Sequence, residues 1–270
     1  MSNHTAILSN SPVRNTQGSR ARRVMVLRLT VIAGVITLIE MLCLVGLIDT
    51  ITMQAPHLIV RDLFRLLASG RMNSAIAKTL TNTLLALLLA ISVGLIAAAV
   101  IHRWRGLRET LDPLFATYYA IPVFAFYPLF VVVFGLGDLP QILIAFMLSV
   151  VAMIVNTLNG LDRVPTVLLK TARVMRLGPA ETAWRLSLQA AAPYIITGIK
   201  LAVAYAFIGT IGSEFIMSTG GIGYEISFAY NNFENATMYP LIMLILIASI
   251  VINSVLSRWE RILLARRGLR

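Results

Sequence analysis

The side chains that most often carry catalysis are few in this sequence and lie far apart. The three histidines, His4, His57 and His102, fall in three separate polar segments and lack the short spacing of metal ligands. The single cysteine, Cys43, lies inside an apolar run, where packing is its ordinary role. The sequence therefore gives no metal site and no resident cofactor.

Two further catalytic patterns fail on geometry. Ser213 and Lys200 share one apolar segment but lie ~20 Å apart along a helix, so they cannot form a Ser/Lys dyad. A Ser/His dyad within a membrane needs a histidine in an apolar run, and none is there. The chain lacks the Gly-x4-Gly-Lys-Ser/Thr loop of P-loop ATPases, and Gly220–Gly223 lacks the strand-turn-helix setting of a dinucleotide site. An intramembrane enzyme stays only as a disfavoured alternative.

Polar side chains within the apolar runs are the next candidates for function. A carboxylate inside a membrane segment is a functional candidate by default, and Glu214 follows Ser213 near the outer end of its run. A structural role at that position, close to water, is equally well supported. Asn156 is a further polar candidate in another run.

Two prolines and a cluster of aromatic residues share a third apolar run. Pro122 and Pro128 each remove a backbone donor and tend to kink a helix. One interpretation is a kinked pore helix with an aromatic gate, and the other is ordinary packing with an interfacial aromatic belt. The aromatic residues are Tyr118, Tyr119, Phe124, Phe126 and Tyr127.

Composition shows what must position these residues. Of 270 residues, 58% are hydrophobic and only 13% are charged, about half the charged fraction of a soluble domain. The net charge of +11 does not indicate nucleic-acid binding, because the basic residues lie between apolar runs and not along one stripe. The sequence predicts an all-α integral membrane protein whose surroundings are the lipid bilayer.

Six apolar runs reach the ~20 residues that cross a bilayer. We expect a disordered tail at 1–23, a transmembrane domain at 24–260 and a basic tail at 261–270. The predicted spans are Val24–Ile48, Leu80–Ile101, Pro113–Phe134, Leu139–Leu158, Tyr194–Phe215 and Met238–Leu256.

The distribution of Lys and Arg predicts the orientation. Eighteen basic residues flank the spans on one side, and the opposite loops hold only Arg61, Arg65 and Arg71. Basic loops face the cytoplasm, so both ends of the chain are expected there. Lys78 is then at the outer end of the second span, where it can snorkel.

The cytoplasmic segment 162–192 has the pattern of a helical hairpin. Val164, Leu168 and Ala172 lie on an apolar stripe of helical period, with Asp162 as a plausible N-cap. Gly178-Pro179 breaks that helix, and a second short helix can begin there. The pattern fits a hairpin lying on lipid as well as it fits a docking element for a cytoplasmic partner.

This segment resembles the permease subunits of binding-protein-dependent ABC importers, in the nitrate/sulfonate/taurine branch. Leu188–Ile195 aligns with that family's Leu-Pro-Ala-Ala-Leu-Pro-Tyr-Ile, and its Glu-Ala-Ala-x3-Gly loop then starts at Lys170. Ala172 matches, whereas Lys170 replaces the Glu and Arg176 replaces the Gly. A shift of two residues would place Gly178 on the family Gly but loses the other matches. The residues implied in coupling are Lys170, Thr171, Ala172, Arg176, Leu177, Gly178 and Pro179.

Shorter motifs extend the resemblance over residues 56–260. They are Asp112-Pro113-Leu114, Ala120-Ile121-Pro122, Tyr127-Pro128-Leu129, Phe134–Asp138, Asn156–Leu161 and Gly221-Ile222-Gly223-Tyr224.

The resemblance implies the fold of a type I ABC importer in a bacterial cytoplasmic membrane. Its implied partners are two P-loop ATPases that bind ATP and Mg, a second permease subunit and a soluble substrate-binding protein. A pathway or gate would use Tyr118, Tyr119, Pro122, Phe126, Pro128, Asn156, Ser213 and Glu214. The alternative is a secondary transporter or channel that needs no ATPase; six spans without a duplicated half fit it less well.

Overall fold

Helices joined by short turns make up the part of the chain that the structure describes. The computed structural model describes residues 16–49, 52–216 and 218–266, and all regular secondary structure within these ranges is helical, as predicted. The chain divides into two units at Val60 and Arg61. The helices are α1 (Thr16–Leu44), α2 (Pro56–Ala68), α3 (Asn73–Arg103), α4 (Arg105–Thr117), α5 (Tyr127–Phe134), α6 (Asp138–Asp162), α7 (Thr166–Val174), α8 (Pro179–Thr182), α9 (Leu188–Ile216), α10 (Ile222–Asn231) and α11 (Asn235–Arg266).

Five helical segments are long and apolar enough to cross a membrane. A sixth candidate, Arg105–Ala120 followed by Val123–Phe134, is bent by 88°. The predicted count of about six spans is therefore confirmed when this bent pair is one span. The five segments are Arg22–Leu44, Asn73–Arg103, Asp138–Asp162, Ala183–Ile216 and Asn235–Ala265.

Some helices differ from the sequence prediction. Helices α2 and α10 occupy segments that were expected to be loops or turns. Helix α1 begins at Thr16, so it includes the last part of the predicted disordered tail, while residues 1–15 lie outside the described residues. The extension is physically reasonable because a nucleated helix propagates readily into Arg, Gln and Ala. Helix α11 likewise extends the sixth span to Arg266.

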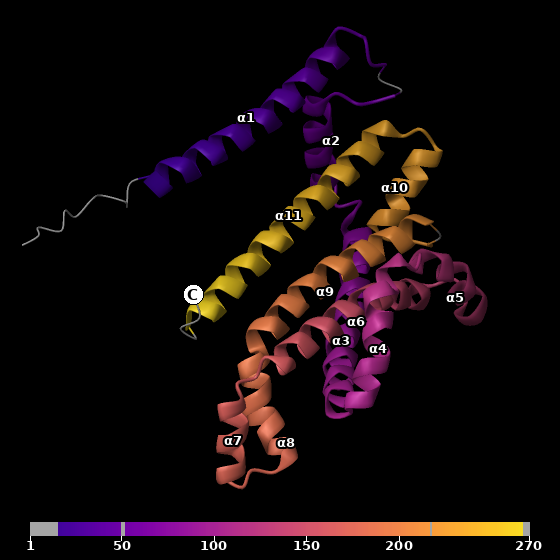
Figure 1. The fold of residues 1–270 in the computed structure, drawn as a ribbon. Coiled ribbons are helices and arrows are strands. Elements are labelled where there is room, and N and C mark those ends of the chain that lie inside the picture. The colour runs from indigo at the N-terminus through magenta and orange to yellow at the C-terminus, as the bar shows by residue number, and fades with distance from the viewer. Residues whose placement is uncertain (1–15, 50–51, 217, 267–270) are drawn as a thin grey trace, which may run out of the picture. The chain divides into compact units, whose positions relative to one another are not determined.

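Helix α6 forms the centre of the second unit and packs between α3 and α9 (Figure 1). In its most apolar stretch 67% of the residues are buried, against 11% in α11. Glycines bring α9 close to α6, because a Cβ at Gly209 would lie 2.6 Å from the Cα of Ala145, and one at Gly198 would lie 3.0 Å from the Cβ of Asn156. These glycines therefore allow the close packing of the two helices.

The third span is broken rather than kinked. Two 3₁₀ turns, Tyr118–Ala120 and Val123–Phe126, flank the break, where Ile121 has an extended backbone and Pro122 is not helical. Pro122 lies at the break, as the kink prediction requires. Pro128 does not kink a helix, because it lies in the first turn of α5, where a backbone donor has no partner within the helix.

A helical hairpin joins α6 to α9. Figure 1 shows α7 and α8 beyond the ends of α6 and α9. Asp162 is not the N-cap of α7: it is the last residue of α6, and α7 begins only after Pro165, because the residue before a proline avoids helical geometry. Helix α8 begins at Pro179 as predicted and continues through a π-helix, Ala183–Ser187, into α9.

Candidate functional site

A buried carboxylate lies where the ends of α3, α9 and α10 meet. The Glu214 side chain is fully buried. The Thr79 hydroxyl lies 2.8 Å and 3.0 Å from its two oxygens and donates to the carboxylate, and the Gly223 N–H donates at 3.0 Å. The Thr79 oxygen in turn accepts from the Ile222 N–H at 2.8 Å. A single carboxylate thus binds the start of α10 to both long helices.

Glycines of the α9–α10 turn make room for this carboxylate. A Cβ at Gly221 would overlap the carboxylate of Glu214, and a Cβ at Gly223 would overlap the carbonyl oxygen of Ile211. Gly221 also has a φ of +106°, which side-chain-bearing residues rarely adopt. The Gly-Ile-Gly-Tyr motif therefore has a local physical reason: bare backbone must lie directly against Glu214.

A second chain of polar contacts adjoins the carboxylate. Lys78 on α3 forms an ion pair of 2.9 Å with Asp138 at the start of α6. The Asn82 amide donates to Gln141 at 3.0 Å. Gln141 donates to the Ser218 hydroxyl at 2.7 Å, and that hydroxyl donates to the Gly220 carbonyl at 2.7 Å. We call Lys78, Thr79, Asn82, Asp138, Gln141, Glu214 and Ser218 the polar cluster.

The polar cluster corrects two interpretations of the sequence. Glu214 is not close to water, because the α9–α10 turn covers it. Lys78 does not extend freely toward the membrane surface but pairs with Asp138. Sequence reasoning missed Thr79, Asn82 and Gln141. Their signal was polar residues within the first turns of two otherwise apolar helices, all three of them buried.

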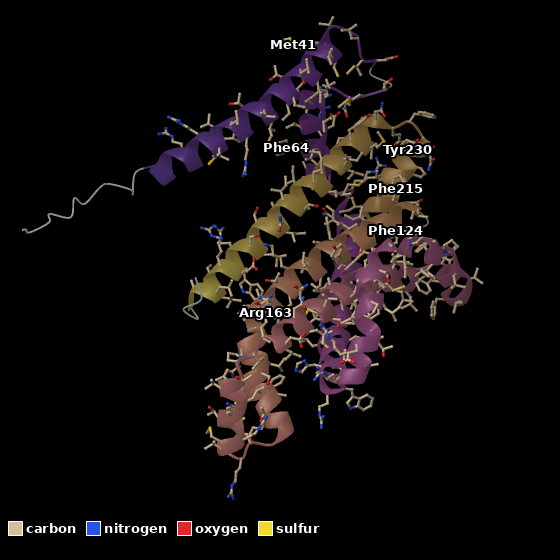
Figure 2. The ribbon with its side chains drawn as sticks, in the orientation of Figure 1. Met41, Phe64, Phe124, Arg163, Phe215 and Tyr230 are labelled. Carbon is tan, nitrogen blue, oxygen red and sulfur yellow. The ribbon has the colours of Figure 1, made fainter. Side chains whose placement is uncertain are left out.

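The predicted gate aromatics lie around the bend between α4 and α5. Tyr118 donates its hydroxyl to the Met147 carbonyl of α6 at 3.0 Å. Tyr119 stacks on Tyr205 of α9, with ring centroids 5.4 Å apart. Phe124, labelled in Figure 2, lies against α9 so closely that a Cβ at Gly212 would be 2.5 Å from its Cζ. The bend is thus fixed to α6 and α9 by aromatic contacts.

The other predicted pathway residues do not join one cluster. Pro122, Phe126 and Pro128 are exposed at the bend. Asn156 donates to the Ala152 carbonyl within α6 at 2.8 Å, and Ser213 donates to the Thr210 carbonyl within α9 at 2.9 Å. Their part in a pathway stays a prediction.

The turn of the hairpin explains one alignment position. Arg176 has a φ of +53°. Its N–H bonds the Arg173 carbonyl at 3.1 Å, and the Leu177 N–H bonds the Ala172 carbonyl at 3.0 Å. These are the two bonds of a Schellman motif, in which the left-handed residue is usually glycine. Arg176, and not Gly178, therefore has the backbone that the family's glycine would favour.

Contacts at the base of the hairpin hold it to α9. The guanidinium of Arg163, labelled in Figure 2, donates to the Tyr194 hydroxyl at 2.6 Å and lies 5.1 Å from the centre of its ring. Ala172 is 2% exposed and belongs to the interior of the hairpin. Lys170, Thr171 and Gly178 are exposed, and Leu177 is half-buried. The backbone at Pro179 starts α8.

The outward side of the hairpin carries apolar residues. Val174 is 84% exposed, Val167 68% and Met175 64%. An exposed apolar patch on a short amphipathic helix indicates a contact with lipid or protein.

Lysine and glutamate also pair between α9 and α11. Lys200 lies 3.1 Å from Glu260, and the Thr197 hydroxyl donates to the same carboxylate at 3.0 Å. Lys200 of α9 thus meets an acid on α11.

Comparison with known proteins covers most of the chain. Residues 90–268 match the family described as binding-protein-dependent transport system inner membrane component. The nitrate import permease protein NrtB of Synechococcus elongatus is 27% identical over 164 residues, 61% of this chain and 59% of that protein. The SsuC protein of Bacillus subtilis, named as an aliphatic sulfonates transport permease, is 26% identical over 223 residues, 83% of this chain and 81% of that protein. The taurine permease TauC of Escherichia coli is 27% identical over 154 residues, which are 57% of this chain and 56% of that protein.

The matched segments thus span less than two thirds of the nitrate and taurine permeases and about four fifths of SsuC.

Two solved structures share the fold. An inward-facing MetNI methionine ABC transporter gives a TM-score of 0.59 at 18% identity and covers 70% of this chain and 94% of its own. An amino acid ABC transporter gives a TM-score of 0.59 at 12% identity, and the match covers 74% of this chain and 97% of that one.

Proposed function

This chain belongs to the family of binding-protein-dependent transport system inner membrane components, and from that premise we propose that it is the permease subunit of an ATP-driven importer. It would line the pathway of a small solute that a soluble binding protein delivers. The name of one relative, a nitrate import permease, supports import as the direction, and the names of two others refer to transport of sulfonates and of taurine.

The hairpin α7–α8 is the observation that carries this proposal. It lies between two membrane-spanning helices, presents exposed apolar residues and continues through its second helix into α9. A partner that holds the hairpin therefore acts directly on a helix that crosses the membrane. We assign the hairpin as the coupling element for a P-loop ATPase, with two ATPases per pair of permeases. ATP and Mg would bind to the partner ATPase.

The same proposal gives roles to the rest of the second unit. A second permease, identical or not, would complete the pathway beside the bend at Pro122, with Tyr119 and Tyr205 at its side. The hairpin end would face the cytoplasm and the polar cluster the opposite side, with both chain ends cytoplasmic. The excess of basic residues near the hairpin and the termini supports this orientation.

Co-purification tests the coupling role. Val174→Glu places a charge on the exposed apolar side of the hairpin, where an interface would have to bury it without a partner. We expect the ATPase recovered with this variant in mild detergent to fall by at least about tenfold. Ala172 is a poor test site, because a charge at this buried position would unfold the hairpin.

Val174→Thr is the matched control, because it keeps the side-chain shape and adds no charge. It should retain most of the ATPase. Full recovery of the ATPase with Val174→Glu would contradict the coupling role, and solute uptake that persists after deletion of the ATPase gene would favour the secondary transporter.

A further inference from the structure

An apolar groove lies where the hairpin meets the end of α3. Its volume is about 340 Å³, within the range of small-molecule sites. Residues of α3, α6, the π-helix and α9 form its walls. The lining includes Ala99, His102 and Arg103 of α3 and Ala183, Trp184 and Ser187 of the π-helix.

The π-helix supplies part of the wall. Ala183, Trp184 and Ser187 all belong to this segment, and Trp184 is 74% exposed. Single π-turns inside α-helices are rare and are frequent at functional sites. Here the π-turn lies where the chain changes from hairpin to membrane span.

The groove is bordered by residues typical of the boundary between membrane and water. Arg103 is the last residue of an apolar span, and Trp104, 64% exposed, follows it. Tryptophan and arginine at the end of a span are typical of the lipid headgroup level. The apolar walls therefore face acyl chains, and the charged end faces headgroups.

Two ionisable residues line the groove, and they differ in their partners. The His102 ring lies 3.2 Å from Asp162, which also accepts from Arg108 at 3.1 Å. Arg103 is exposed, and within residues 16–49, 52–216 and 218–266 no acidic side chain pairs with it. An unpaired guanidinium beside an apolar groove is complementary to a ligand with an anionic head and a hydrocarbon tail.

The geometry points to a binding site for an anionic phospholipid of the bilayer, with an acyl chain in the groove and the headgroup phosphate on Arg103. Basic pockets between transmembrane helices bind anionic headgroups in this way. This lipid would contact both α3 and the hairpin segment. The site stands on the groove, the position of Arg103 and the π-turn, and does not depend on an ATPase partner.

Trp184 provides a probe inside the site. Trp104 and Trp259 are exposed and can be changed to Phe, so that Trp184 is the only tryptophan in the full chain. The chain is reconstituted in phosphatidylcholine nanodiscs that contain the same small fraction of either brominated phosphatidylglycerol or brominated phosphatidylcholine. One favourable basic contact predicts enrichment of the anionic lipid at the site by about fivefold. Quenching of Trp184 should be stronger with brominated phosphatidylglycerol by a corresponding margin.

Three variants show whether the groove is responsible. Arg103→Gln should remove the preference for the anionic lipid, whereas Arg105→Gln, a nearby exposed arginine outside the groove, should keep it. Ala99→Phe fills the groove and should reduce quenching by both lipids. Equal quenching by both lipids in the parent chain, a preference that survives Arg103→Gln, or a Trp184 that neither lipid quenches because protein covers the groove would overturn the assignment.

Discussion

At the scale of single residues, Glu214 shows how a charge is accommodated inside this helical unit. Its burial is offset by hydrogen bonds from the Thr79 hydroxyl and the Gly223 N–H. Lys78 and Asp138 form their ion pair nearby. The carboxylate thus acts as an acceptor that fixes the α9–α10 turn.

Glu214→Ala should therefore be costly. The change leaves the Thr79 hydroxyl and the Gly223 N–H without their acceptor in a buried place, so we expect the free energy of unfolding to fall by about 3 kcal/mol. Denaturant titration in mixed micelles measures it.

Ser213→Ala is the matched control for this prediction. Ser213 is equally buried, but its hydroxyl donates to the Thr210 carbonyl of its own helix, and among the described residues it joins no other helix. Its loss should lower the free energy of unfolding by less than about 1 kcal/mol. An equal loss of unfolding free energy in the two variants would show that the carboxylate does not stabilise the α9–α10 turn.

Arg176→Gly should stabilise the hairpin. Arg176 has a left-handed backbone, which costs a residue with a side chain about 1 kcal/mol relative to glycine. Amide hydrogen exchange across residues 166–187 should slow by about fivefold in the variant, because local opening becomes rarer by that factor.

Arg173→Gly has the opposite expectation. Arg173 lies within α7, where glycine lowers helix stability by about 1 kcal/mol. Exchange should therefore become faster. A slowing in both variants would mean that lost charge, and not backbone geometry, controls the hairpin.

At the scale of elements, local patterns predicted helices well and their contacts poorly. Five of the spans followed from the length of apolar runs, and the hairpin followed from apolar spacing and from Gly178-Pro179, because these are local signals. The 88° bend at Pro122 was not predictable, since a proline indicates a break but not its angle. The π-turn at Ala183–Ser187 also has no local signature.

The candidate site was likewise predicted only in part: one residue was identified from the sequence, but its contacts were not. Glu214 was identified by its type alone, as a carboxylate in an apolar run. Its partner Thr79 lies 135 residues away in the sequence, and only the packing of α3 on α9 brings the two together. Gly223 is nine residues from Glu214, across the α9–α10 turn. A single sequence holds no direct signal of such long-range pairs.

Gly209→Ala should weaken the contact between α6 and α9. The added methyl group would lie 2.6 Å from the Cα of Ala145, and backbone cannot yield as a flexible side chain can. We expect a loss of about 2 kcal/mol in the free energy of unfolding.

Gly106→Ala is the control for Gly209→Ala, because nothing lies within 4 Å of its added methyl. This variant should leave stability unchanged or raise it slightly. A comparable loss in both variants would contradict close packing as the cause.

At the scale of the whole molecule, the second unit has two chemically different ends. Helix α9 runs from the hairpin to the polar cluster, a length of ~43 Å for its 29 residues, enough to cross a bilayer. The hairpin end is basic and presents apolar residues, and the other end holds the polar cluster, in which Thr79, Asn82, Gln141 and Glu214 are buried.

Cysteine labelling tests which end faces the cytoplasm. In a Cys43→Ser background, Asn232→Cys reports the end of α10 and Gly178→Cys reports the hairpin, and both positions are exposed. A membrane-impermeant maleimide should label Asn232→Cys in intact cells with their outer membrane permeabilised, and Gly178→Cys only after lysis. Labelling of Gly178→Cys in intact cells would reverse the orientation.

The fit between Glu214 and Gly221 has a consequence for how such chains diverge. Position 221 cannot accept a side chain while the acid is present, because that side chain would occupy the space of the carboxylate. Loss of the acid would open that space, but the positive φ at 221 would still favour glycine. Among descendants of this gene, a side chain at 221 should therefore occur only where 214 is no longer an acid, whereas glycine at 221 should often outlast the acid.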